Sequence, residues 1–150
     1  MGPAYVPMIS KLVGVCTALA IIRNGKVLLK ERKDQYYQGW EAPGGAQGPG
    51  ENYADAAKRH AKEEFGMEVR FIKILAEFDN PDNVRAHDHT VLLLCEPLSE
   101  PKDGEWLDKC PENMIPEHQH YRPVIDAYLA KSLLIENRKS ISSFYDLENI

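Results

Sequence analysis

A loop rich in glycine and proline runs directly into a charged helix between residues 39 and 68, in the segment GWEAPGGAQGPGENYADAAKRHAKEEFGME. The adjacent glycines of the loop let the backbone approach a ligand closely, while its prolines restrict the conformations that it can adopt. Asn52 followed three residues later by Asp55 is typical of a capped helix start, and Gly66 is typical of a helix end. The segment therefore predicts a stiff loop followed by a helix over residues 53–65.

The predicted helix carries acidic side chains along one edge. At about 100° per residue, His60, Glu63 and Glu64 share that edge. The neighbouring stripe is small and apolar and suits packing on a sheet; it consists of Ala54, Ala57, Ala61 and Phe65. Two adjacent carboxylates repel each other, and a hard divalent cation with oxygen ligands would relieve that repulsion. The pattern predicts a cation at Glu63 and Glu64, next to a carbonyl of the Gly-Gly turn; a solvated amphipathic helix after a flexible loop is the alternative.

The rest of the chain alternates between segments typical of strands and one more helix. Five segments have the apolar composition or the alternation of strands, namely residues 12–22, 27–32, 68–79, 89–97 and 105–108. Asn24-Gly25 lies between the first two and predicts a tight hairpin. Residues 118–134 have the apolar spacing of a helix, whereas KDQYYQGW is predicted to be a loop. This order predicts an α/β fold with a mixed sheet between two helices.

The length of 150 residues predicts one domain. We expect a flexible leader over residues 1–11, the domain over residues 12–135 and a tail over residues 136–150. The leader lacks the charged and apolar regions of a signal peptide. No apolar run approaches the roughly 18 residues that a membrane span requires. These features predict a cytoplasmic protein that does not bind a membrane.

Net charge and cysteine usage exclude further classes of function. The formal net charge is −5, which argues against binding to a nucleic-acid backbone because such binding needs a basic face. Cys16, Cys95 and Cys110 are far apart in the sequence and show no metal-binding spacing. They are therefore predicted to be buried free thiols in a reducing compartment.

The loop and the helix together resemble the Nudix box, G-x5-E-x7-R-E-U-x-E-E-x-G-U, in which U is an aliphatic residue. The residues in register are Gly45, Glu51, Arg59, Glu63, Glu64, Gly66 and Met67. The preceding WEAPGG is similar to the Trp-x-x-Pro-Gly-Gly that usually leads into the box. By this resemblance the chain is identified as a member of the Nudix hydrolase family, and the resemblance implies an α/β/α sandwich.

The resemblance also implies an activity. Members of the family are pyrophosphohydrolases that use Mg²⁺ or Mn²⁺ to cleave a nucleoside diphosphate linked to another moiety. By this analogy Glu63 and Glu64 hold the metal together with the carbonyl of Gly44, Arg59 orients Glu63, and Glu51 supports the loop. The expected partner is a small nucleoside diphosphate derivative; a homodimer is compatible with the resemblance, because members of the family often dimerise, although the sequence itself does not indicate the oligomeric state.

The chain departs from the family pattern at residue 60, where His60 replaces the glutamate that normally follows the box arginine. An imidazole suits Zn²⁺, Mn²⁺ or Ni²⁺ better than Mg²⁺, so His60 is also a candidate metal ligand. Loss of a ligand carboxylate should cost at least the roughly 10–100-fold that follows from altering its supporting residues. Three outcomes follow: a slow enzyme, an active one with a repositioned carboxylate or a different metal preference, or an inactive domain that binds a nucleotide or a partner protein.

A further acid or base is expected from a loop outside the box. Glu100 lies where some members of the family place a catalytic glutamate, so it is a candidate for the reaction itself. Asp103 and Glu105 rank behind it. Each of these acids would otherwise be an ordinary solvent-exposed side chain.

Other candidates concern substrate binding. His87 and His89 would lie on one face of a strand near the site, as ligand contacts or as polar residues at a strand entrance. Tyr36, Tyr37 and Trp40 precede the box, and one of them would stack on a base, although Trp40 also suits a structural role.

Two more histidines, His118 and His120, begin the last predicted helix. Both are expected at the surface.

Overall fold

The described residues, 13–82 and 87–148 of a computed structural model of this chain, form a mixed sheet of seven strands. The strands are β1 (Gly14–Arg23), β2 (Lys26–Lys33), β3 (Gln38–Glu41), β4 (Gly44–Ala46), β5 (Val69–Asn80), β6 (Asp88–Pro97) and β7 (Glu105–Leu107). The main order across the sheet is β3-β2-β1-β6-β5, while β4 pairs with β1 and β7 pairs with β2. The predicted leader lies outside the described residues, so the proposed domain limits stay a prediction.

Strands β1 and β6 are parallel neighbours at the centre of the sheet, and the other strand pairs are antiparallel. Gly14 pairs with Asp88, so both strands begin at the same edge of the sheet. Ala18, further along β1, pairs with Gly44 of β4. Residues 14 to 18 of β1 therefore connect the β6 entrance with the Gly-Gly turn.

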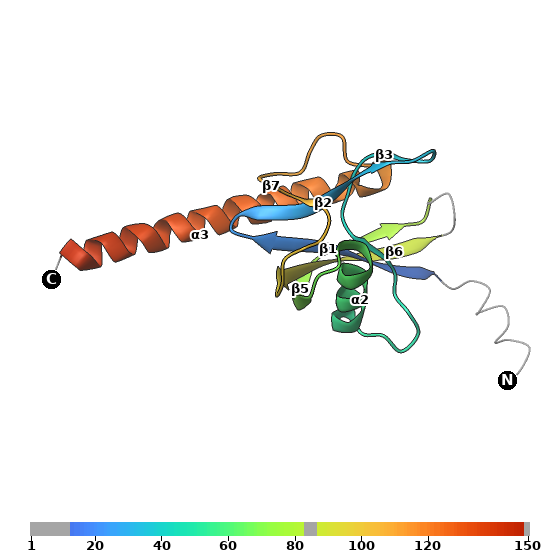
Figure 1. The fold of residues 1–150 in the computed structure, drawn as a ribbon, viewed down its shortest axis with the longest axis horizontal. Helices are drawn as coiled ribbons and strands as arrows, with labels where there is room; N and C mark the ends of the chain where they lie inside the picture. Colours follow the sequence, from blue (N-terminus) through green and yellow to red (C-terminus); the bar gives the residue numbers. More distant parts are fainter. Residues whose placement is uncertain (1–12, 83–86, 149–150) are drawn as a thin grey trace, which may run out of the picture.

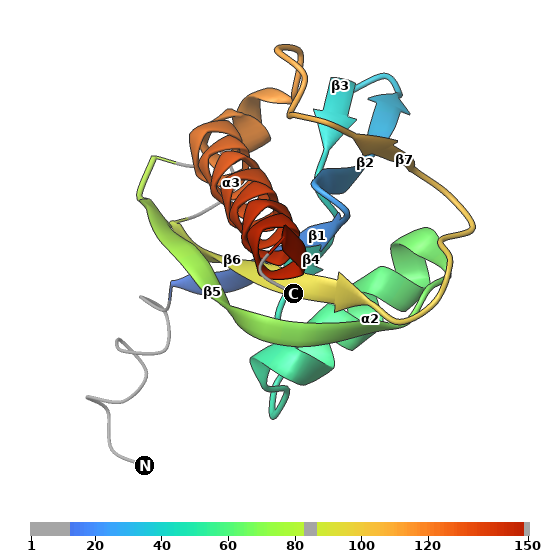
Figure 2. The ribbon, with the colours of Figure 1, turned by 90° about the vertical axis from the view of Figure 1, so that its left-hand side faces the viewer.

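Helix α2 (Tyr53–Phe65) covers one face of the sheet and helix α3 (Arg122–Glu148) covers the other, as Figures 1 and 2 show. Side chains of β1 alternate between the two layers. Leu19 and Ile21 pack in the core cluster with α2, whereas Ala18 and Ala20 pack in the cluster with α3. The predicted α/β/α sandwich is confirmed.

Helix α2 begins and ends where the sequence predicts. Asn52 Oδ1 accepts a hydrogen bond from the Asp55 amide at 2.8 Å, and Asp55 Oδ2 accepts one from the Asn52 amide at 3.4 Å. Gly66 ends the helix in the left-handed conformation, with φ 59°. The predicted packing stripe was wrong at one position, because Ala54 is exposed and Ala56 is buried in its place.

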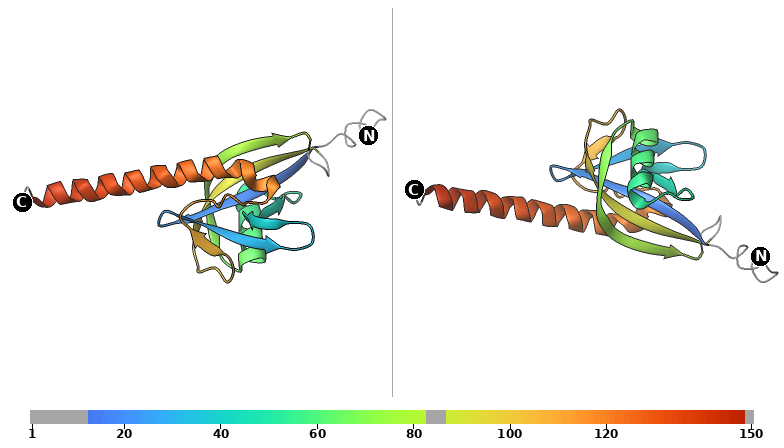
Figure 3. Two further views of the ribbon diagram at one scale, coloured as in Figure 1. Left: turned by 90° about the horizontal axis from the view of Figure 1, so that it is seen from above. Right: turned by 90° about the horizontal axis from the view of Figure 1, so that it is seen from below.

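The second helix differs from its predicted bounds. A 3-10 helix, η1 (Pro116–Tyr121), precedes α3, and α3 continues to Glu148, past the predicted end at Leu134 and through most of the predicted tail. Figure 3 shows this helix projecting beyond the sheet. Residues 124–150 contain no Gly or Pro, so intrinsic helix propensity is favourable where the apolar periodicity is weak. In the described part of the chain no helix is both long and apolar enough to cross a membrane.

The sequence did not predict β3 and β4. Residues 38–41 form β3 by pairing with β2, with Glu41 opposite Lys30. In β4, a Cβ atom on Gly44 would lie 2.1 Å from the carbonyl oxygen of Thr17. A glycine is therefore required for the close pairing of the turn with β1, and this pairing is non-local.

Candidate functional site

A cavity of about 1000 Å³ lies along the first half of β1. Its charged end is formed by Arg32, Glu41, Gly44 and Glu64. The rest of the lining includes Asn80, Thr90, His118, His120 and Tyr121, called here the neutral wall, with the acids Asp79, Asp82, Asp88 and Glu117 beside them. The strand register places Gly44 opposite Ala18 and Asp88 opposite Gly14, while His118 reaches the charged end through its contact with Ala42.

The carboxylate of Glu64 is held at the charged end by the Gly-Gly turn. Glu64 Oε2 accepts a hydrogen bond from the Gly44 amide at 2.6 Å. Burial raises the pKa of Glu64 to about 7, the negative charge of Glu41 adds to the rise, and the Gly44 amide and Lys30 oppose it. A carboxylate in this state would be stabilised in its ionised form by a cation in the cavity.

Glu41 is a site residue that the sequence analysis missed. Its side chain is 18% exposed, lines the same cavity as Glu64 and lies 3.4 Å from Nη1 of Arg32. The residue stands in WEAPGG, directly after Trp40, in a segment interpreted as a loop. Recognising β3 would have placed Glu41 opposite Lys30, but no local pattern predicts that pairing.

Arg59 ties α2 to the loop before it. Its Nε lies 2.7 Å from Oε2 of Glu51 and its Nη2 lies 2.9 Å from Oε1, so the pair is bidentate. Nη2 also donates to the carbonyl of Ala46 at 2.8 Å. Glu51 accepts a further hydrogen bond from the Gly48 amide at 2.8 Å. The hydrogen bonds from Arg59 are the main reason that the pKa of Glu51 falls to about 2.

Glu63, the other acid of the predicted cation pair, is oriented differently from Glu64. Its side chain is 61% exposed and lies 3.5 Å from Nη1 of Arg59. Glu63 is not among the described residues that line the cavity, whereas Glu64 is. Of the two adjacent acids, Glu64 is therefore the one already directed into the cavity.

His60 packs beneath β4 and does not share the exposed edge of α2. The residue is 4% exposed, makes a hydrogen bond to the Gly45 backbone, and has its ring 3.2 Å from where a Cβ on Gly45 would lie. Burial lowers the pKa of His60, and the charge of Arg59 lowers it further. Within the described part of the chain its Nε2 atom has no hydrogen-bond partner. The imidazole is thus a neutral packing group for Gly45, one residue along β4 from the glycine that binds Glu64.

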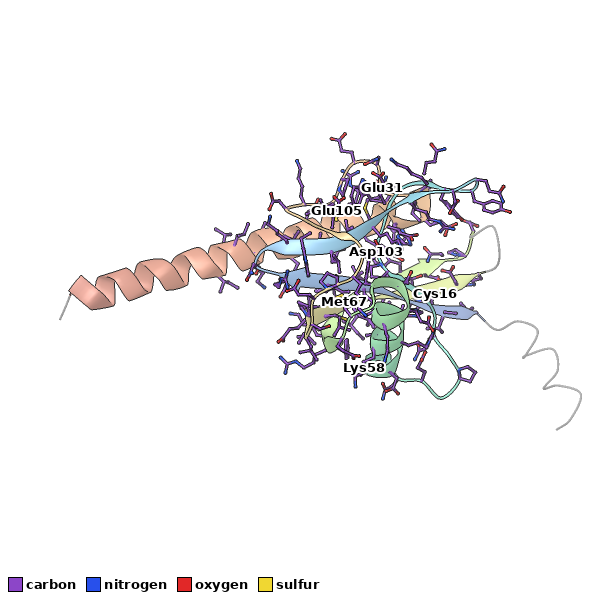
Figure 4. The ribbon with its side chains drawn as sticks, in the orientation of Figure 1. Cys16, Glu31, Lys58, Met67, Asp103 and Glu105 are labelled. Atoms are coloured by element: carbon purple, nitrogen blue, oxygen red, sulfur yellow. The ribbon has the colours of Figure 1, made fainter. Side chains whose placement is uncertain are left out.

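The loop acids are distributed unevenly around the site. Glu100 is 77% exposed, lies 2.5 Å from Arg23 and is not among the described cavity-lining residues. Asp103 lies 2.7 Å from Nζ of Lys30, a residue whose charge reaches Glu64. Figure 4 shows Asp103 near the end of α2, where the adjacent Lys102 amide donates to the carbonyl of Phe65.

The aromatic residues before the box divide between the cavity and the core. Tyr37 lines the cavity, and its hydroxyl lies 2.5 Å from Oε1 of Glu117. Trp40 is half-buried against the core cluster that includes α3, and its backbone pairs with Asn113 and Ile115. Tyr36 is 76% exposed. Tyr37 is thus the member of this group placed to contact a ligand.

The histidines at the β6 entrance do not both face the cavity. His87 lines it and lies 2.5 Å from Oδ1 of Asp79. His89 lies 3.9 Å from Glu77 and is not among the described lining residues. The expected common face is wrong because β6 begins at Asp88, so alternation within the strand applies to His89 and not to His87.

His118 and His120 are not the surface residues that the sequence predicted. Both are half-buried and line the cavity. His118 Nδ1 accepts a hydrogen bond from the Ala42 amide at 3.1 Å, and burial lowers the pKa of His118 to about 4. The ring of His120 lies 4.3 Å from that of Tyr121. Pro116, which starts η1 before them, was the available signal that these residues precede α3.

The cysteines fit their prediction in part. None of the three, all of which the structure describes, forms a disulfide. Cys95 and Cys110 are buried, whereas Cys16 is half-buried and lines the cavity.

The donor atoms of the charged end match the chemistry of a divalent cation. Glu41 and Glu64 present carboxylate oxygens to one cavity, and oxygen donors are those that Mg²⁺ and Mn²⁺ prefer. No group of three or more His, Cys, Asp or Glu side chains in the described ranges is arranged to hold a metal ion. Such a donor set suits a cation that completes its shell with water and substrate oxygens.

An α/β/α sandwich with an acid-bearing helix held against a Gly-Gly turn defines the class of protein. A family model described as the NUDIX domain matches residues 15–144. The chain therefore belongs to the Nudix family.

Several known proteins resemble this chain. Nucleoside diphosphate-linked moiety X motif 6 of Mus musculus is 34% identical over 76 residues, which cover 50% of this chain and 24% of that protein. The protein of that name from Xenopus laevis is 29% identical over 102 residues, covering 65% and 47%. CTP pyrophosphohydrolase of Escherichia coli K12 is 31% identical over 106 residues, covering 58% and 78%. The chain spans less than half the length of the first two relatives.

Solved structures support the fold. A UDP-X diphosphatase superposes with a TM-score of 0.64 at 15% identity, covering 88% of this chain and 72% of that one. An ADP-ribose pyrophosphatase from Streptococcus suis superposes with a TM-score of 0.63 at 22% identity, covering 81% and 92%.

Proposed function

We propose that this chain is a Nudix-type pyrophosphohydrolase that cleaves a nucleoside diphosphate linked to another moiety and depends on Mg²⁺ or Mn²⁺. The observation that carries the proposal is the half-buried Glu64 carboxylate, held at 2.6 Å by the Gly44 amide in a cavity of about 1000 Å³. The names of the curated relatives, a nucleoside diphosphate-linked moiety protein and a CTP pyrophosphohydrolase, support the substrate class.

Glu64 and the carbonyl of Gly44 would hold the cation. The Gly44 amide points to Glu64 and therefore away from β1. The amide and the carbonyl of one strand residue point to the same side of the strand, so the Gly44 carbonyl also points away from β1. Glu63 stays a predicted ligand whose exposed side chain would leave Arg59 to reach the cavity. A divalent cation there supplies neutralisation of charge on the diphosphate oxygens and activation of water.

The remaining groups of the site would bind and orient the substrate. Arg32 brings positive charge to the end of the cavity where the diphosphate would lie. The clamp of Arg59 on Glu51 and Ala46 fixes the turn against which the phosphates would bind. Residues 14–18 span about 13 Å at about 3.3 Å per residue, so a nucleoside would extend towards the neutral wall.

A domain that binds a nucleotide or a partner without hydrolysis is the second candidate. It is favoured by His60, which stands where the box has an acid and is buried away from the cavity. The cytoplasmic location expected from the sequence and the homodimer compatible with the resemblance likewise stay predictions.

Release of phosphate or nucleoside monophosphate from a substrate panel separates the two candidates. The panel contains nucleoside triphosphates, nucleoside diphosphate sugars, dinucleoside polyphosphates and dinucleotide coenzymes, each with Mg²⁺ and with Mn²⁺. We expect at least one substrate to be turned over about 100-fold faster by the natural chain than by Glu64→Gln, with the exposed Glu68→Gln as the matched control. Calorimetric nucleotide binding without turnover on any substrate would instead support the binding domain.

A further inference from the structure

We propose that Glu41 supplies the carboxylate that the box lacks at residue 60, so that strand β3 and helix α2 together hold the cation. This inference rests on the proposed function and deepens it. It assigns to Glu41 a contact with the metal and to His60 the positioning of the Gly-Gly turn.

His60 is not positioned as a ligand in the cavity, because its side chain already packs against β4. The side chain is 4% exposed, contacts Gly45 and hydrogen-bonds to the Gly45 backbone. Moving the imidazole into the cavity would break that hydrogen bond and open a void beneath the strand, both of which cost stability. The site therefore needs its further acid from another element.

Glu41 is a further acid that lines the same cavity as Glu64. It comes from the last residue of β3, directly opposite Lys30 in the sheet, and its side chain is 18% exposed. Both carboxylates line the cavity, and the charge of Glu41 adds to the burial that raises the pKa of Glu64. Two like charges from separate elements are held together here, which is unfavourable without a cation between them.

The basic residues nearby are shared with other acids. Arg32 lies 3.4 Å from Glu41 and also forms an ion pair with Asp34. Lys30 forms an ion pair with Asp103 at 2.7 Å. Each basic side chain is therefore matched by an acid outside the pair of Glu41 and Glu64.

The positive charge of Arg32 and Lys30 is therefore shared among more acids than it can neutralise. When ionised, Glu41, Glu64 and the two outer acids carry four negative charges against the two positive charges of Arg32 and Lys30. The excess of two negative charges equals the charge of one divalent cation.

Mn²⁺ binding measured by calorimetry and by electron paramagnetic resonance tests the assignment without any substrate. The proteins are the natural chain, Glu41→Gln, Glu64→Gln and the matched control Glu31→Gln, whose site on β2 is labelled in Figure 4 and pairs with Lys33 at 2.7 Å. Glu41→Gln keeps the size of the side chain and an acceptor for Arg32. We expect it to weaken Mn²⁺ binding about 10–100-fold while Glu31→Gln stays within about twofold.

The outcomes separate this inference from the proposed function. Mn²⁺ binding that is lost in Glu64→Gln but unchanged in Glu41→Gln overturns the role of Glu41 and leaves the proposed function standing. Mn²⁺ binding that is indifferent to Glu64→Gln overturns both. A second variant, Glu41→Asp, retains the charge and should bind Mn²⁺ more tightly than Glu41→Gln; equal affinities of these two variants would also contradict the assignment.

Discussion

The two ends of the cavity are built on different principles. The charged end is fixed by ion pairs and by hydrogen bonds to backbone amides, as in the contacts of Glu64 with Gly44 and of Arg59 with Glu51. The neutral wall is formed by buried and half-buried side chains packed on one another, with the ring centroids of His120 and Tyr121 4.3 Å apart. The first arrangement presents charged groups to a ligand, and the second presents mainly aromatic and imidazole rings with acids beside them.

The difference also concerns the origin of each end in the chain. Most of the charged end comes from residues 41–64, a continuous segment. The neutral wall comes from β5, β6 and η1, which are brought together by the sheet and by the start of α3.

The largest expected effect is a loss of folding stability in acid, caused by protonation of His118 in the neutral wall. His118 is half-buried, and desolvation lowers its pKa from 6.5 to about 4, so between these values the unfolded chain binds a proton that the folded chain does not bind. The stability from this group is fully present above about pH 6.5 and is lost as the pH falls towards 4, by about 3 kcal/mol. Urea unfolding at pH 4 to 7 should show this slope, and His118→Gln should flatten it. An unchanged slope in the variant would show that His118 is not the titrating group.

Removing the contacts of Arg59 with Glu51 and Ala46 should lower activity through the charged end and leave the structure of the neutral wall unchanged. Arg59→Ala leaves Glu51 and the Ala46 carbonyl without their partner, so we expect kcat/KM to fall about 10–100-fold. Arg59→Lys keeps the charge but not the bidentate geometry and should recover little. Arg70→Ala, which removes an exposed ion pair with Glu96, is the control and should leave the rate unchanged. Full activity in Arg59→Ala would contradict the role of the clamp.

A smaller effect should separate the folding of α2 from the site that it carries. Asn52→Ala removes the side-chain cap at 2.8 Å from the Asp55 amide and should lower the free energy of unfolding by about 1 kcal/mol. The cap lies at the opposite end of the helix from Glu64. The value of kcat/KM, measured under conditions in which the variant is fully folded, should therefore not change. A loss of activity larger than the loss of stability would mean that the helix start also shapes the cavity.

The smallest expected effect is the acid response of the charged end. The pKa of Glu51 falls from 4.5 to about 2, mainly through its hydrogen bonds from Arg59. The stability that this pair contributes is present above about pH 4.5 and is lost as the pH falls towards 2, which is a lower window than that of His118. Thermal unfolding of Glu51→Gln against the natural chain should show a difference that shrinks across this window. If the two proteins still differ in stability at pH 2, the stabilisation comes from packing of the Glu51 side chain and not from its charge.

Local patterns in the sequence predicted α2, its caps and the acids that it carries. The reciprocal cap of Asn52 and Asp55 and the end at Gly66 depend on neighbours within one helix, so spacing alone reveals them. Strand β3 could not be predicted in this way. It exists because Trp40 exchanges backbone hydrogen bonds with Asn113 and Ile115 and because β2 pairs with its other edge.

The site was therefore only partly predictable. Glu64 followed from the box, but Glu41 depends on the pairing of β3. The burial of His60 depends on how closely Gly45 approaches α2. The inward placement of His118 and His120 depends on the turn of η1 against the sheet, to which no periodicity in the sequence points.

The central claim is that the Glu64 carboxylate, on the Gly44 amide, is where a divalent cation binds. Anomalous scattering from crystals soaked with Mn²⁺ and a non-hydrolysable nucleoside diphosphate analogue tests this claim most directly. A peak is expected within about 2.0–2.6 Å of a Glu64 oxygen, with diphosphate oxygens on the same ion. Ordered diphosphate in the cavity with no metal at Glu64, and with Glu64 still bound to the Gly44 amide, would contradict it.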